Sequence, residues 1–280
     1  MQTALALGTF DGVHRGHRAV LDLPRQCKKV AVIFARPPKA EKVDGVKLIM
    51  TYEDKCRALK NIGMDEIVTL DFRRVCNLSP QDFLSYLQRT FSPAVISCGF
   101  DYRFGKDAAG DAALLQNFCK ANDITLCCRP PVKEGEKVIS STMIRGLLKD
   151  GDIKAANALL SEDFSFEAVV VGGHRLGRTL GFPTINQVYP PELTPLRFGV
   201  YATEIILDGQ TYRGMTDIGI RPTFETDYII SETYIHGFSG DLYGKTVRVK
   251  PLRFIRDEKK FSSINELKKQ LEQDKAAILL

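Results

Sequence analysis

The sequence lacks the features that mark membrane-spanning and secreted proteins. It has no apolar run approaching the roughly 18 residues that a membrane-spanning helix needs. Residues 1–5 contain no basic segment, and Asp11 soon interrupts the apolar run that follows them, so we expect no secretory signal peptide. We therefore predict a cytoplasmic location and no membrane partner.

A concentrated basic segment is also missing. The formal net charge at pH 7 is only +5, and the lysines and arginines do not gather in one run. Proteins that bind nucleic acid carry a clustered basic footprint, so we predict no nucleic-acid partner. A mild positive charge suits small anionic ligands instead. Composition leaves the oligomeric state open.

Cysteine is absent from the second half of the chain, and no two cysteines form a C-x-x-C pair. The seven cysteines lie between residues 27 and 128. An odd number without paired spacing argues against a disulfide framework or a metal cluster and favours buried thiols. The uneven distribution, with a length of 280 residues against about 150 per typical domain, favours two domains. We place them at residues 1–160 and 161–280.

The first domain alternates short apolar runs with segments of helical periodicity. This alternation is typical of a Rossmann-like α/β fold, a parallel sheet with helices on both faces. We predict strands at 4–7, 30–34, 66–70, 94–98 and 124–128, and helices at 15–21, 51–62, 79–90 and 111–122. Ligands bind beyond the carboxyl ends of such strands, which places residues 8–17 and 99–105 at the functional edge.

The second domain carries mainly strand patterns. After two short helices at 143–149 and 153–160, we predict strands at 166–171, 199–207, 210–217, 229–236 and 246–254. Asp208-Gly209 between two of them is a hairpin turn, and strands without intervening helices favour a small antiparallel β-barrel. Residues 263–280 form an amphipathic helix. Its apolar stripe is expected to pack on the barrel and contains Ile264, Leu267, Leu271 and Ile278.

Two motifs of the first domain place phosphate-binding groups at helix starts. Gly8–His17 reads G-T-F-D-G-V-H-R-G-H after a strand, and Ser140–Arg145 reads S-S-T-M-I-R. Helix N-termini present unpaired N–H groups and partial positive charge, so both motifs suit the phosphates of a nucleotide. His14 and His17 lie three residues apart and share one helix face. A pair of ordinary surface histidines is the alternative, which the full motif disfavours.

The second domain contains a glycine-rich segment followed by neutral oxygen ligands. Gly173 and Gly177 lie in a loop that can wrap phosphates, with Arg178 supplying charge. Thr184 and Asn186 provide two oxygens suited to a Mg²⁺ ion that also binds ATP. Glu232 lies in an apolar strand and is a candidate general base for a hydroxyl that attacks the γ-phosphate. An outward-facing strand position is the alternative for this residue.

These motifs resemble a known family along nearly the whole chain. Gly8–His17 resembles the H-x-G-H nucleotidyltransferases in the form found in bacterial FMN adenylyltransferases. Residues 139–145 are similar to that family's second ATP-binding segment, and residues 99–105 to its flavin-site segment. Residues 173–186 resemble the riboflavin kinase fingerprint, and further similar segments lie at 199–201, 218–224, 232–235 and 256–261. The sequence is identified as a member of the bifunctional riboflavin kinase/FMN adenylyltransferase family, the FAD synthetases.

The resemblance implies two ATP-dependent reactions on small-molecule substrates: phosphorylation of riboflavin to FMN, then adenylylation of FMN to FAD with release of pyrophosphate. It implies Mg²⁺ as cofactor, with another divalent cation as the alternative. The catalytic residues would be Glu232, His14, His17 and Arg145. ATP or its phosphates would be bound by Gly8, Phe10, Gly16, Ser140, Ser141, Thr142, Gly173, Gly177 and Arg178. The flavin would contact Asp101, Phe104 and Arg221, and the metal Thr184 and Asn186.

Two segments depart from the family pattern. The family usually has Phe-x-Pro-His-Pro after its second strand, where this chain has Phe34–Pro38, F-A-R-P-P, without histidine. It also tends to have a basic residue before the Gly-Asp that follows the flavin segment, where this chain has Ala108-Ala109. Arg36 is a candidate replacement for the missing charge. Two alternatives therefore stay open: a riboflavin kinase with a weakened adenylyltransferase domain, and a flavin-binding regulator.

Overall fold

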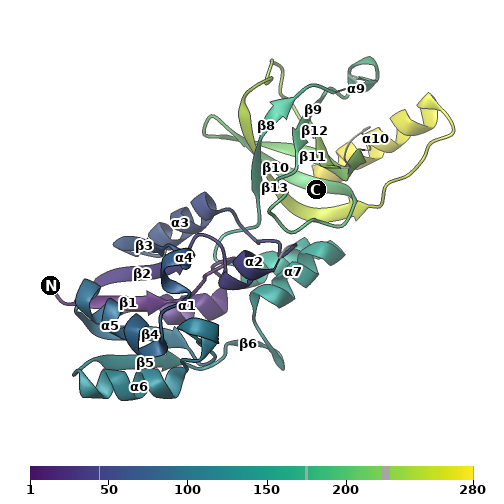
Figure 1. Ribbon diagram of the computed structural model, residues 1–280. Coiled ribbons are helices and arrows are strands. Elements are labelled where there is room, and N and C mark those ends of the chain that lie inside the picture. Colours follow the sequence, from purple (N-terminus) through teal and green to yellow (C-terminus); the bar gives the residue numbers. More distant parts are fainter. Residues whose placement is uncertain (44, 174–175, 222–227, 280) are drawn as a thin grey trace. The chain divides into compact units, whose positions relative to one another are not determined.

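The computed structural model describes residues 1–43, 45–173, 176–221 and 228–279, which fold into two compact units (Figure 1). The first unit comprises residues 1–143 and 159–162, and the second comprises residues 144–158 and 163–280. The chain therefore leaves the first unit, returns to it for four residues and leaves again. Along the described residues no helix combines the length and the apolar character needed to cross a membrane.

The first unit is built on a five-stranded parallel sheet with the order β3-β2-β1-β4-β5. The order reverses between β1 and β4, which is where α/β sheets bind ligands. Its strands are β1 (Thr3–Leu7), β2 (Lys28–Phe34), β3 (Glu66–Leu70), β4 (Pro93–Gly99) and β5 (Thr125–Arg129). Its helices are α1 (Arg15–Leu21), α2 (Pro38–Lys42), α3 (Tyr52–Asn61), α4 (Phe72–Val75), α5 (Pro80–Phe91), the 3₁₀ turn η1 (Lys106–Ala108) and α6 (Ala112–Ala121).

Successive side chains of β1 enter two separate cores, which confirms helices on both faces of the sheet. Leu5 and Leu7 belong to a cluster that includes residues of α5 and α6. Ala4 and Ala6 belong to a cluster that includes residues of α1 and α3. The small alanines let the second helical layer approach closely, so both faces of the strand are fully buried.

Two helices and a hairpin follow the sheet. The hairpin pairs β6 (Lys133–Glu134) with β7 (Lys137–Val138), and α7 (Ser141–Asp150) and α8 (Ile153–Leu159) come next. The turn between α7 and α8 packs within the second unit, because a Cβ on Gly151 would lie 3.2 Å from the Arg197 side chain and 3.5 Å from the Phe254 ring. Asn157 of α8 accepts a hydrogen bond from the Phe164 amide at 2.9 Å, which fixes the entry to the barrel.

The second unit is a closed antiparallel barrel with the strand order β10-β11-β12-β9-β8-β13, which confirms the predicted antiparallel β-barrel. Asp208 and Gly209 both have positive φ, 49° and 78°, so the predicted hairpin turn is confirmed. The elements are β8 (Phe166–Val171), α9 (Leu176–Thr179), β9 (Thr184–Val188), β10 (Gly199–Leu207), β11 (Gln210–Arg221), β12 (Tyr228–Ile235), β13 (Thr246–Arg256) and α10 (Ile264–Ile278). Strand β9, which closes the barrel, was not among the predicted strands.

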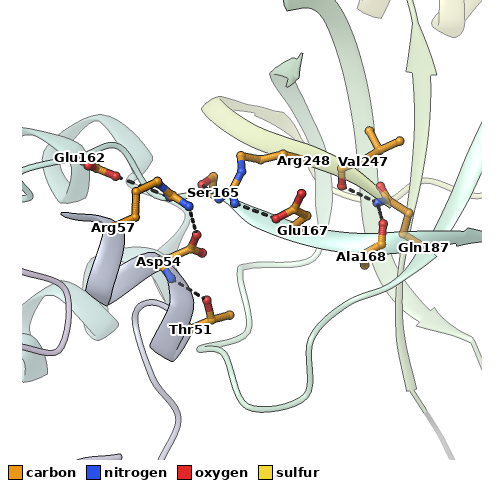
Figure 2. Close-up of polar contacts among 10 residues, drawn as sticks. All are labelled: Thr51, Asp54, Arg57, Glu162, Ser165, Glu167, Ala168, Gln187, Val247 and Arg248. Carbon is orange, nitrogen blue, oxygen red and sulfur yellow. Dashed lines mark hydrogen bonds and ion pairs between the residues drawn. The ribbon is translucent and has the colours of Figure 1, made fainter. Parts of the chain in front are cut away.

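Polar contacts stitch each unit internally (Figure 2). In the barrel, the fully buried Gln187 donates hydrogen bonds to the carbonyls of Ala168 and Val247, at 2.6 and 2.8 Å, and so joins β9 to β8 and β13. In the first unit, Arg57 of α3 pairs with Asp54 and, at 3.5 Å, with Glu162. The second pair ties the returning segment 159–162 to the α/β unit.

The C-terminal helix packs on the barrel through most of its predicted stripe. Ile278 is buried, and Leu267 and Leu271 pack against the same apolar cluster. Ile264 is 63% exposed, so its predicted place in that core was wrong. It is the first residue of the helix, directly after the N-cap Ser263, and it does not belong to the apolar cluster. The buried Asp274 pairs with Arg256 of β13 at 2.7 Å and anchors the helix.

Candidate active sites

A cleft of about 450 Å³ opens at the switch point of the first unit. It lies between the carboxyl ends of β1 and β4, as predicted for residues 8–17 and 99–105. The three motif segments of the first domain meet there. They are far apart in the sequence: Ser141, for example, donates a hydrogen bond to the carbonyl of Asp11, 130 residues earlier. The predicted site residues that line the cleft are Gly8, Phe10, His14, Gly16, His17, Asp101, Ser140, Ser141 and Thr142.

The two histidines of the H-x-G-H motif stack at the start of α1. Their ring centroids lie 3.6 Å apart at an interplanar angle of 18°. His14 is the N-cap of the helix, and its Nδ1 accepts a hydrogen bond from the His17 amide at 3.3 Å. A Cβ on Gly16 would lie 3.1 Å from the His14 ring, so glycine allows this close approach. The histidines therefore form one block at the cleft, as the i, i+3 spacing predicts.

His17 is held neutral by its surroundings. Burial, the neighbouring His14 and the Lys55 ammonium together keep the pKa of His17 well below its ordinary value. Its Nδ1 is buried with no hydrogen-bond partner among the described residues. Phe10 packs edge-on against the ring at 5.3 Å. A neutral imidazole offers a hydrogen-bond donor to a phosphate, and the approach of phosphate charge favours its protonation.

The hydroxyls predicted to bind phosphate also hold the second motif in place. Ser141 donates a hydrogen bond to the Asp11 carbonyl at 2.8 Å, which ties the start of α7 to the H-x-G-H loop. Ser140 accepts from the Met143 amide at 3.3 Å and acts as a helix cap. Thr142 is exposed at the cleft. Arg145 lies one turn further along α7, within the second unit.

The flavin-site segment divides between the cleft and the core. Asp101 is exposed at the cleft, and Tyr102 and Arg103 join it in the lining. Phe104 is 5% exposed, belongs to the core cluster and stacks on Tyr102 at 5.7 Å. The structure therefore places the Phe104 ring behind the cleft wall. A flavin contact of Phe104 stays a prediction.

The segment Phe34–Pro38, which differs from the family pattern, lies partly at the cleft. Phe34 and Pro38 line it, whereas Arg36 is exposed and is not a lining residue. Two cations that the motifs did not reveal are close to the site. Arg129 lines the cleft at the end of β5 with a buried Nε that has no partner among the described residues. The other is Lys55, and the sequence offered only its position on a predicted helix.

The barrel contains a pocket of about 260 Å³. Among the predicted site residues, Gly177, Thr184 and Glu232 line it, with Asp217 and Arg256 beside them. Arg221, predicted to contact the flavin, forms an ion pair with Glu232 through Nη2 and Oε1. Glu232 is therefore paired as well as pocket-facing, and its side chain is 39% exposed. Its carboxylate has a second oxygen with which to accept a proton.

Carboxylates gather on the same wall of this pocket. Asp217 of β11 is the cross-strand partner of Glu232, and Glu258 also lines the pocket. Although Asp217 keeps part of its surface open to solvent, desolvation by the pocket walls and the charge of Glu258 raise its pKa to about 6. An acidic wall of this kind favours ligands with hydroxyl donors or a bound cation.

The predicted metal ligands and glycines lie on and beside β9. Asn186 is the cross-strand partner of Glu232, is 6% exposed, and has an Oδ1 with no partner among the described residues. A Cβ on Gly173 would lie 2.3 Å from the Asn186 amide nitrogen, and one on Gly177 would lie 2.2 Å from the Phe182 carbonyl oxygen. Only glycine permits these approaches. Arg178 lies in α9, and the motif residues His174, Arg175, Pro222, Thr223 and Phe224 fall outside the described residues.

A second hollow of about 290 Å³ shares Thr184 with this pocket. Its wall combines Pro183 and Ile185 with residues 235 and 238–243. Thr184 thus borders two hollows of the barrel. The described residues contain no group of three or more His, Cys, Asp or Glu side chains arranged for a metal ion.

Comparison with protein families matches both halves of the chain. Residues 1–143 match the FAD synthetase family, and residues 160–279 match the riboflavin kinase family. A crystal structure described as that of a macrolide-efflux protein from Streptococcus pneumoniae is 32% identical, with a TM-score of 0.91. The match covers 99% of this chain and 93% of that chain. The fold of the whole chain is thus shared with a solved structure.

Curated relatives agree along almost the full length. A bifunctional riboflavin kinase/FMN adenylyltransferase of Listeria monocytogenes is 34% identical, covering 96% of this chain and 89% of that protein. The enzyme of the same name from Escherichia coli is 35% identical, with 96% and 90% covered. That from Bacillus subtilis is 31% identical, with 98% and 90% covered. With both halves matched in order, the chain belongs to the bifunctional riboflavin kinase/FMN adenylyltransferase family.

Proposed function

We propose that the barrel phosphorylates riboflavin to FMN with ATP, and that the α/β unit then transfers an adenylyl group from a second ATP to FMN. One observation carries this proposal. Each unit has its own pocket, and motif residues typical of the family that matches that unit line the pocket. Riboflavin, FMN and ATP are then the small-molecule substrates. The cytoplasmic location stays a prediction from composition.

In the barrel, Glu232 acts as general base toward the primary hydroxyl of riboflavin. Its Oε1 is held by Arg221 and its strand neighbours are Asp217 and Asn186, so the carboxylate is fixed in orientation. The proton leaves the hydroxyl as its oxygen attacks the γ-phosphate, and ADP departs. A base that is already fixed in orientation lowers the entropic cost of reaching the geometry for attack.

In the cleft, the phosphate of FMN attacks the α-phosphate of ATP, and pyrophosphate leaves. This displacement needs no covalent enzyme intermediate, so positioning and charge stabilisation supply the catalysis. The stacked His14 and His17 donate hydrogen bonds to the phosphates. Arg145 is proposed as a further cation for the triphosphate.

Mg²⁺ is the proposed cofactor of the kinase reaction, and the residues on β9 fit it. The Asn186 Oδ1 is buried without a partner among the described residues, and Thr184 faces the pocket two residues away. Neutral oxygens of this kind suit a Mg²⁺ ion that keeps several waters and shares phosphate oxygens of ATP. When bound, the ion neutralises charge on those phosphates.

Replacing Asn186 with Ala should raise the Mg²⁺ concentration that gives half-maximal FMN formation by about tenfold or more, because even the loss of a group that only orients a metal ligand weakens metal binding by that factor. Asn61 of the first unit is a control, since Asn61→Ala leaves the barrel untouched. The measurement is FMN formation against Mg²⁺ concentration at saturating riboflavin. An unchanged Mg²⁺ requirement in a folded Asn186→Ala protein would remove Asn186 from the metal site.

The decisive experiment incubates the purified protein with riboflavin and Mg-ATP and separates the flavins by chromatography. Sequential appearance of FMN and then FAD supports the bifunctional proposal. FMN without FAD, even with added FMN and excess ATP, would replace it with the kinase-only alternative. Flavin binding without either product would favour the regulator.

We propose residues 161–280 as the kinase domain and expect that fragment to make FMN. A fragment of residues 144–280 keeps α8 and its Asn157 cap on Phe164, and we expect it to unfold at a higher temperature because it retains those contacts. Circular dichroism and FMN formation check both fragments. A folded fragment that makes no FMN would contradict the assignment of the kinase to the barrel.

A further inference from the structure

A buried lysine, Lys55, lies beneath the cleft of the first unit. It sits on α3 and is only 3% exposed. Its Nζ donates hydrogen bonds to three backbone carbonyls: Thr9 at 3.3 Å, Phe34 at 2.6 Å and Ala35 at 3.0 Å. An ammonium group has three N–H donors, so this arrangement uses all of them.

Burying a lysine is costly, and burial lowers the pKa of Lys55 from its ordinary value. The nearby Asp11 carboxylate opposes that change. A leucine or methionine on the inner face of α3 would fill the same kind of space without a charge to desolvate. The positions of the three carbonyls that accept from Lys55 explain what its ammonium group contributes to the structure.

The acceptors belong to two loops that follow neighbouring strands. Thr9 lies in the loop between β1 and α1 that carries the H-x-G-H motif, Phe34 is the last residue of β2, and Ala35 directly follows it. Thr9 and Phe34 also line the cleft. One ammonium therefore joins the two loops at the edge of the sheet where the nucleotide is proposed to bind.

The first of these loops has a backbone that needs such support. Phe10 has φ 50° and Val13 has φ 37°, values that side chains with a Cβ rarely adopt. Strained conformations persist only where surrounding contacts over-determine them. Lys55 holds the carbonyl directly before Phe10, and Ile49 donates to the Asp11 carboxylate at 2.9 Å, directly after it.

We propose that Lys55 is a positioning residue for adenylyl transfer, which ties the H-x-G-H loop to the end of β2 and so sets the place of the histidines and of the segment Phe34–Pro38. The inference rests on the proposed adenylylation. It also explains how the segment can differ from the family pattern. Lys55 holds the segment through backbone carbonyls, and these are present whatever the side chains are.

Lys55 also acts on His17 through its charge. Burial, His14 and Lys55 all lower the pKa of His17. The other charged groups are Asp11, which lies near Lys55, and the cleft-lining Asp101, Arg103 and Arg129. Removal of the Lys55 charge should therefore raise the pKa of His17, whereas an arginine at position 55 should leave it nearly unchanged.

The test compares Lys55→Met and Lys55→Arg with Lys60→Met, which removes an exposed lysine from the same helix. FAD formation from FMN should fall by about 10²-fold in kcat/KM for Lys55→Met, the cost of a small misplacement of reacting groups. Lys55→Arg should show a smaller loss, because a planar guanidinium keeps the charge without reproducing the three-carbonyl geometry. Riboflavin phosphorylation, measured on the same proteins, should stay unchanged in all three.

The imidazole pKa of His17, followed by NMR and assigned through its loss in His17→Gln, separates positioning from mere stability. It should rise in Lys55→Met and stay unchanged in Lys55→Arg and Lys60→Met. Normal FAD formation by Lys55→Arg or by a folded Lys55→Met protein would overturn the inference, and so would an equal loss of both reactions. Absence of FAD from the unmodified protein would overturn the proposed adenylylation itself.

Discussion

Glu232→Gln is expected to lower FMN formation by about 10²–10⁴-fold, the usual contribution of a general base. FAD formation from supplied FMN should be unchanged, because the cleft of the first unit shares no residue with the barrel pocket. Glutamine keeps the size of the side chain and can still accept a hydrogen bond from Arg221 through its amide oxygen. What it loses is the capacity to take the proton of the attacking hydroxyl.

A matched control is available on the same barrel. Glu167 of β8 is 43% exposed and pairs with Arg248 at 2.7 Å, much as the 39% exposed Glu232 pairs with Arg221 (Figure 2 shows the Glu167 pair). Glu167→Gln therefore breaks an equivalent ion pair outside the pocket and should leave both reactions intact. The measurement is initial FMN formation at saturating riboflavin and ATP.

The ratio of the FMN formation rates of Glu232→Gln and Glu167→Gln separates a loss of chemistry from a loss of stability. Exposed ion pairs contribute only about 0–1 kcal/mol, so neither variant should unfold the barrel. If Glu232→Gln retains normal FMN turnover, Glu232 is an ordinary strand position and its pairing with Arg221 is structural. If Glu167→Gln loses as much activity as Glu232→Gln, the effect comes from the barrel and not from the base.

The elements with strong local patterns could be predicted from the sequence. The strand 66–70, the helix 15–21 and the hairpin at Asp208-Gly209 agree with the structure, because periodicity and turn chemistry act within a few residues. Strand β9 escaped prediction because its sequence, T-I-N-Q-V, has two polar residues that are buried. Gln187 is tolerated there only because strands β8 and β13 supply acceptors, and that information is tertiary.

The site shows the same division. Strand order alone predicted that His14 and Asp101 would lie at one edge of the sheet, and the structure brings them to one cleft together with Ser141. Lys55 gave no signal, since a lysine in an amphipathic helix is normally exposed. Likewise, no local pattern reveals that Arg221 pairs with Glu232, because the partners meet only through the register of β11 and β12. Side chains that act through long-range contacts need the fold before they can be recognised.

His14→Ala and His17→Ala are each expected to lower FAD formation from FMN by at least about 10²-fold, comparable to the loss of one oxyanion-hole donor. The two rings stack at 3.6 Å, so removing either also frees the other to move, and the double variant should cost less than the sum of the two. Riboflavin phosphorylation should survive in all of them. His236→Ala, in the barrel unit, is the control that should leave FAD formation unchanged.

The size of the remaining activity also bears on the departing segment after β2. In the unmodified protein, slow but measurable FAD formation would agree with compensation for the missing histidine of the family pattern. The candidates for that compensation are Arg36 and Lys55, which donates hydrogen bonds to the carbonyls of Phe34 and Ala35. FAD formation by His14→Ala and His17→Ala at the rate of the unmodified protein would show that the stacked pair only caps α1. Phosphate stabilisation would then have to come from Arg145 or from the cleft-lining Arg103 and Arg129, whose replacement would become the next measurement.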